Sequence, residues 1–205
     1  AIEELDELGL PIGSVIVNRT IPAYLSPHDL AKAAEGDVDA DAVAIFERGA
    51  ALLEELGHAV VEVDPPWHQP HVLDAFVGVF GPALCTQMAL LQMFHGRDLV
   101  ADDVEALSWA MWERCRAIDS IEGALAAGTL QRFAREVVSW SDEYDAVLTP
   151  ALAEPPLPLG VMTTDDRSAP MEGFDRSAQF TPFTAICNIT GQPAISLPLH
   201  WSADG

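Results

Sequence analysis

Ser196 and His200 are a serine and a histidine, the residue types that serve as a catalytic nucleophile and its general base. A serine hydroxyl attacks a carbonyl only when a neighbouring base removes its proton. The two residues lie on an expected strand with Pro198 between them, and no Gly-x-Ser-x-Gly segment places a serine on the strained turn of a hydrolase. The pattern therefore favours a packed strand serine over a catalytic pair.

Zinc-binding residue types occur together in one short stretch. His68 and His71 lie between Asp64 and Asp74, and imidazoles and carboxylates are ordinary zinc ligands. The spacing is loose, and Pro70 interrupts the helix that would bring both imidazoles to one face. We interpret these residues as surface loop residues and expect no metal site.

The sequence lacks the residues that phosphate-binding sites of nucleotide hydrolases usually contain. A phosphate loop needs Gly-x-x-x-x-Gly-Lys followed by serine or threonine, so that backbone amides and a lysine face the anion. The sequence contains one lysine, Lys32, in a polar stretch with no glycine loop before it. A lysine that acts as a general base needs burial beside its nucleophile, and this stretch is expected to be exposed. We expect no cofactor.

The charge balance limits the partners. Of 205 residues 49% are hydrophobic, and 32 acidic against 10 basic side chains give a formal charge of −22. A folded domain with this charge repels nucleic acids and anionic membranes. No leader and no apolar run long enough for a bilayer occur, so we expect a cytoplasmic protein. The cysteines Cys85, Cys115 and Cys187 are far apart and are expected to be reduced.

Helical and strand patterns alternate along the chain and must position these residues. Apolar segments at 13–18, 58–63 and 145–149 predict buried strands. Residues 43–56 carry apolar side chains at helical spacing, and Gly57 is expected to end that helix. The alternation predicts an α/β protein.

Longer helices are expected between the second and third strands. The apolar stretch 73–94 predicts a helix that breaks where two glycines and Pro82 occur. Asp102 and Asp103 are expected to cap a helix with one apolar face as far as residue 125, and Gly128 to separate it from another. Residues 193–198, flanked by prolines, predict a last strand.

Three segments resemble, in order, the C-terminal half of amidase-signature enzymes: residues 51–62, 144–152 and 180–198. The last is the most specific, because Asn-x-Thr-Gly-Gln-Pro-Ala-Ile-Ser-x-Pro is an unusual string. The resemblance extends over residues 42–205. It implies an incomplete C-terminal portion of an α/β/α fold with a mixed sheet.

The resemblance also implies hydrolysis of the C–N bond of a small-molecule amide through an acyl-enzyme on a serine. In this family a second serine, in a cis peptide, and a lysine relay the proton, and a Gly-Gly-Ser-Ser-type loop holds the oxyanion. The sequence has no stretch that corresponds to these groups. We therefore expect an amidase fragment that is inactive alone and carries no catalytic residue.

Substrate-pocket positions do carry over. The resemblance implies that Thr181, Phe183, Asn188 and Gly191 belong to the acyl pocket. Family members that take glutamine have an acidic residue seven positions before the asparagine, where this chain has Thr181. This departure indicates a general amidase and not a glutamine-dependent amidotransferase.

The first forty-odd residues resemble another family. Residues 8–22 are similar to the late strand of anion-transporting ATPases, in which the asparagine after the strand contacts adenine, and Asn18 occupies that position. Without a phosphate loop, Asn18 makes a weak nucleotide contact at best. We therefore divide the chain into an ATPase-like segment, residues 1–41, and an amidase-like part, residues 42–205, and interpret the junction as a chimeric or misassembled reading frame.

Two other functions stay open. Half of a sheet-centred domain leaves apolar faces uncovered, so the chain could be a noncatalytic interaction module that self-associates. It could also be a nucleotide-binding fragment derived from an ATPase.

Overall fold

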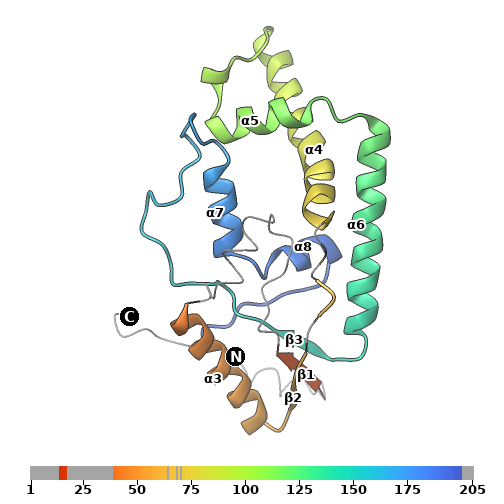
Figure 1. Cartoon of the computed structure of the whole chain (residues 1–205), viewed down its shortest axis with the longest axis vertical. Helices are drawn as coiled ribbons and strands as arrows, with labels where there is room; N and C mark the ends of the chain where they lie inside the picture. The colour runs from red at the N-terminus through yellow and green to blue at the C-terminus, as the bar shows by residue number, and fades with distance from the viewer. Residues whose placement is uncertain (1–13, 18–38, 64, 68, 70, 200–205) are drawn as a thin grey trace.

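The computed structural model describes residues 14–17, 39–63, 65–67, 69 and 71–199 (Figure 1). Asn18, Lys32, Asp64, His68 and His200, which the sequence singled out, lie outside the described residues. The strand β1 is described by its backbone alone.

Three short strands form a parallel sheet in the order β2-β1-β3. They are β1 Ser14–Val17, β2 Ala59–Glu62 and β3 Ala146–Leu148, so strands are confirmed where the sequence predicted them. In β1, Val15 is opposite Val60 of β2 and Ala146 of β3. The ATPase-like segment therefore supplies the middle strand of the described sheet.

The strands are less buried than predicted. Val61 of β2 is 44% exposed, and the side chains of β3 are only half-buried. β2 is an edge strand of the described sheet, and α3, Ala40–Glu55, contacts it. Asp39 caps α3 by accepting the Asp41 N–H at 2.8 Å, and Gly57 follows the helix with φ 94°. The predicted helix and its glycine end are confirmed.

The helix α4, His71–His95, runs without the predicted break. Its glycines serve close packing instead: a Cβ on Gly81 would overlap the Cys115 Sγ, and one on Gly78 would lie 2.7 Å from the Ala126 Cβ. Pro82 removes one backbone donor from the helix, and packing of α4 against two other helices offsets that loss.

The single helix predicted from Asp102 to residue 125 is two helices. A 3-10 turn at Ala101–Asp103 precedes α5, Ala106–Cys115, and α6 follows as Ser120–Ser141. Asp119 begins α6 as the first residue of a capping box, in which its carboxylate accepts the Ile121 and Glu122 N–H groups at 2.8 Å. Gly128 does not separate helices, because α6 continues through it.

The last two described helices lie beside the first turns of α4. They are α7, Glu172–Phe180, and α8, Ala185–Thr190, which ends at Gly191 with φ 75°. The strand predicted at 193–198 is absent from the described residues. Its flanking prolines lack the N–H groups that pairing requires, and Ile195 is 75% exposed. Figure 1 shows the sheet and α3 at one end of the molecule, α5 at the other, and α6 running along one side down to the level of β3.

Two clusters of buried side chains hold the helices together. The first, which we call the α8 cluster, joins α4, α6 and α8 through Trp67, Val72, Phe133, Val137 and Ile186. The second joins α4 and α5 through Val77, Met111 and Cys115.

By length and composition α4 is apolar enough to cross a membrane, with a mean hydropathy of 1.4 over its best window. Core helices also meet this criterion. In the described fold α4 contacts α5 and α6 and contributes to both clusters, and 28% of its most apolar window is buried.

Candidate substrate-binding site

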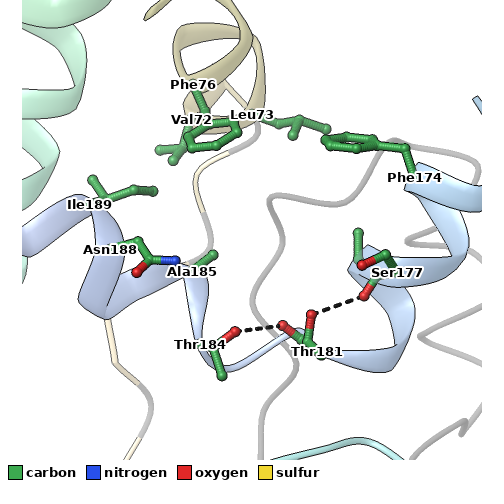
Figure 2. Close-up of a pocket in the computed structure, with 11 residues that line it drawn as sticks. Val72, Leu73, Phe76, Phe174, Ser177, Thr181, Thr184, Ala185, Asn188 and Ile189 are labelled. Carbon is green, nitrogen blue, oxygen red and sulfur yellow. Dashed lines mark hydrogen bonds between the residues drawn. The ribbon is translucent and has the colours of Figure 1, made fainter. Parts of the chain in front are cut away.

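A cavity of about 190 Å³ lies between the first turns of α4, the end of α7 and the start of α8 (Figure 2). One side is apolar and the other carries hydroxyl and amide groups. The lining residues are Val72, Leu73, Phe76, Phe174, Ser177, Ala178, Thr181, Thr184, Ala185, Asn188 and Ile189.

The apolar side is continuous with the protein core. Val72 is fully buried and belongs to the α8 cluster, and Leu73, Ala185 and Ile189 pack against that cluster. Close packing fixes the rotamers of such residues. The cavity is therefore preformed by the same contacts that stabilise the fold.

The polar side consists of groups with defined hydrogen bonds. The Thr181 hydroxyl donates to the Ser177 carbonyl at 3.0 Å, and the Thr184 hydroxyl donates to the Thr181 carbonyl at 3.3 Å. Both hydroxyl oxygens keep the capacity to accept a hydrogen bond. Among the described residues, the Asn188 side chain has no hydrogen-bond partner, so its amide can both donate and accept.

No side chain in the lining titrates near neutral pH. The lining contains neither aspartate, glutamate, histidine, lysine nor cysteine. General acid–base catalysis requires such a group within hydrogen-bonding reach of the substrate. The described cavity can therefore bind and orient a polar neutral group, whereas proton transfer would need residues from elsewhere.

The structure brings together two of the four residues predicted for the acyl pocket. Thr181 and Asn188 line the cavity from α7 and α8. Phe183 is buried in the connection between these helices, 3% exposed, and does not line the cavity. Gly191 is the left-handed residue that ends α8 and also lies outside the lining.

Sequence reasoning missed the aromatic half of the lining. Phe76 comes from α4 and Phe174 from α7. The sequence predicted a helix around Phe76, but helical spacing gives no sign that one residue faces a cavity and its neighbours face a core. Only the packing of α7 against the start of α4 separates these cases.

The other candidates form no site within the described residues. Ser196 is exposed on an extended segment, and His71 and Asp74 are exposed at the start of α4. The described part of the chain contains no group of three or more potential metal ligands.

The cysteines are free thiols. Desolvation raises the pKa of Cys85, and the neighbouring Cys115 raises it further. Desolvation also raises the pKa of Cys115. Both shifts disfavour the thiolate, which is the nucleophilic form of cysteine.

The Amidase family model matches residues 31–205, and the chain belongs to this family. A putative amidase AmiC of Mycobacterium leprae is 32% identical over 158 residues, which cover 77% of this chain and 33% of that protein. The 6-aminohexanoate-cyclic-dimer hydrolase of Paenarthrobacter ureafaciens is 30% identical over 180 residues, 82% of this chain and 35% of that protein. The chain thus spans about a third of the length of these curated relatives.

Solved structures confirm the fold class. The structure of 6-aminohexanoate cyclic dimer hydrolase complexed with substrate superimposes with a TM-score of 0.72 at 27% identity. The match covers 96% of this chain and 40% of the other. The fold is therefore a portion of the amidase-signature α/β fold.

The ATPase resemblance is also confirmed. ATPase BagA of Mycobacterium tuberculosis is 77% identical over 43 residues, 21% of this chain and 13% of that protein. The family match begins at residue 31, so the boundary near residue 42 stays a prediction.

Proposed function

We propose that this chain forms the acyl-binding part of an amidase and that catalytic groups outside its sequence cleave the bound amide. Membership of the amidase family supports amide hydrolysis as the reaction. The cavity has one apolar and one polar side and is lined by neutral groups. This lining supports substrate binding by this chain and catalysis by groups outside it.

The polar side of the cavity matches a carboxamide in its hydrogen-bonding groups. The Asn188 amide offers a donor to the substrate carbonyl and an acceptor to its N–H₂ group. The oxygen of Thr181 or of Thr184 accepts the second N–H of the substrate, because both hydroxyl hydrogens are already used within the chain. A bound amide therefore directs its acyl group toward Phe76 and Phe174.

By this proposal, the chain binds the amide but does not hydrolyse it alone. Its single lysine, Lys32, lies outside the described residues, and the sequence lacks a Gly-Gly-Ser-Ser-type loop. A serine such as Ser177 stays un-ionised without a base beside it, and the lining provides none.

Hexanamide is expected to bind the purified chain without being hydrolysed. Binding is measured from saturation transfer to its acyl protons, and hydrolysis from ammonia release. The variant Asn188→Ala is expected to weaken binding by about five- to a hundred-fold, the worth of two neutral hydrogen bonds. Gln87→Ala, on the exposed part of α4, is the matched control and leaves binding unchanged.

Two results would contradict the proposal. Serine-dependent ammonia release by the isolated chain would show that the catalytic groups are present after all. Absence of any contact between hexanamide and a chain with a folded circular dichroism spectrum would show that the cavity is not an amide site.

Exposed apolar side chains favour a second role as an interaction module. Met93 and Phe94 near the end of α4 are 77% and 86% exposed, and Ile121 and Leu125 on α6 are each 69% exposed. Apolar surface of this kind commonly marks an interface. We propose that two copies associate through these residues.

Sedimentation velocity tests this association. The charge of −22 repels a second copy, so the oligomeric fraction is expected to rise with salt, which screens the repulsion. The double variant Met93→Glu and Phe94→Glu is expected to stay monomeric. The control Leu159→Glu and Val161→Glu adds the same charge on an exposed loop and should associate like the original chain. Equal behaviour of both variants would contradict the proposal.

A further inference from the structure

We infer that the cavity selects amides with an uncharged, apolar acyl group, and that Phe76 and Phe174 are its specificity-determining residues. This inference rests on the proposed function, because it assumes that the cavity receives the acyl side of an amide. It adds which acyl groups are accepted and which residues decide this.

The cavity has an apolar side and a polar side. Figure 2 shows Leu73 and Phe76 of α4 and the ring of Phe174 on one side, and Thr181 and Thr184 across from them. Every polar lining group lies on α7, on α8 or in the turn between them, whereas α4 contributes only apolar side chains. The carboxamide and the acyl chain of a ligand therefore bind at different places.

No charged side chain lines the cavity. Arg176 is the cation nearest in sequence to Phe174, and it is paired with Glu154 and lines a different surface hollow. A carboxylate or ammonium at the end of an acyl chain would lose its hydration against Phe76 and Phe174 and gain no counter-charge, which is strongly unfavourable.

A volume of about 190 Å³ is somewhat larger than that of an engineered apolar cavity of ~150 Å³ that binds benzene, so the space suits a ligand with roughly six carbon atoms. A straight acyl chain of about five carbons fills this space when its carboxamide stays on the polar side. Each methylene removed is expected to weaken binding by about four-fold.

Three ligands of matched length test the selection. Hexanamide ends in a methyl group, adipamate carries a carboxylate at that end, and 6-aminohexanamide carries an ammonium group there. We expect hexanamide to bind the full chain at least about ten-fold more tightly than either charged ligand, in titrations followed by protein chemical shifts. Butanamide, two methylenes shorter, is expected to bind about fifteen-fold more weakly than hexanamide.

The variant Phe174→Arg tests the residue assignment. An arginine there supplies the missing cation, so it is expected to weaken hexanamide binding and strengthen adipamate binding, reversing their order. Leu159→Arg is the matched control, because Leu159 is fully exposed on a loop outside the cavity, and it should keep the original order. Circular dichroism checks that both variants fold, and the wild-type ligand series tests the selection even if one does not.

The outcomes separate the inference from the proposed function. Equal binding of hexanamide, adipamate and 6-aminohexanamide would overturn the inference and leave the amide site intact. An unchanged order of affinities in folded Phe174→Arg would overturn the assignment of Phe174. Absence of binding by all the amides would overturn the proposed function as well.

Discussion

The Phe133→Ala variant is expected to lose about 3–5 kcal/mol of the free energy of unfolding. Phe133 is 1% exposed on α6 and packs in the α8 cluster with Val72 and Ile186. Its removal leaves a cavity between three helices that the backbone cannot fully close. Domains are stable by about 5–15 kcal/mol, so the loss is a large part of the total.

The same variant also links the core to the site. Val72 belongs to the cluster and lines the substrate cavity, so loosening the cluster is expected to weaken hexanamide binding too. Urea denaturation measures the stability. The control Gln131→Ala shortens an exposed side chain on the same helix and should change stability by less than about 0.5 kcal/mol. Similar losses in both variants would contradict the described packing.

The Gly81→Val variant is the second large effect, with an expected loss of about 1–3 kcal/mol or more. A Cβ at this position would overlap the Cys115 Sγ and lie 2.6 Å from the Cys115 Cβ, so α4 and α5 must separate to admit it. Glycine inside a helix ordinarily costs about 1 kcal/mol relative to alanine. Close helix contact reverses the sign of that preference here.

Gly128 provides the matched comparison for this prediction. It lies inside α6, and a Cβ added there would meet no atom within 4 Å, so Gly128→Ala is expected to raise the melting temperature. Gly81→Ala, in contrast, is expected to lower the melting temperature, because its Cβ would overlap the Cys115 Sγ and lie 2.6 Å from the Cys115 Cβ. A stabilised Gly81→Ala variant would show that α4 and α5 do not pack as described.

Local patterns in the sequence were sufficient for several elements. The positions of β2 and β3, the helix α3 and its end at Gly57 followed from apolar spacing and one glycine, because these signals act over a few residues. The amidase resemblance likewise depended on short ordered strings. It predicted an acyl pocket at Thr181, Phe183, Asn188 and Gly191; the first and third of these line the described cavity, and its role as an acyl pocket stays a prediction.

The errors share a physical cause. Glycine breaks an isolated helix and also lets two helices approach closely, and the sequence around Gly78 and Gly81 is the same in both cases. The strand predicted at 193–198 needed a partner strand that local spacing cannot supply. The capping box at Asp119 was readable from Glu122 three residues later, but the continuous apolar face concealed it.

By itself, the sequence determined the family and the α/β class, and it predicted an acyl pocket at Thr181 and Asn188. Only the tertiary structure decided that the start of α4 lies beside α7 and α8, so that Phe76 and Phe174 line the same cavity without a charged side chain. The reason is that helical periodicity specifies which face of a helix is apolar, whereas the partner that covers that face, or leaves it open to a ligand, depends on residues distant in the chain.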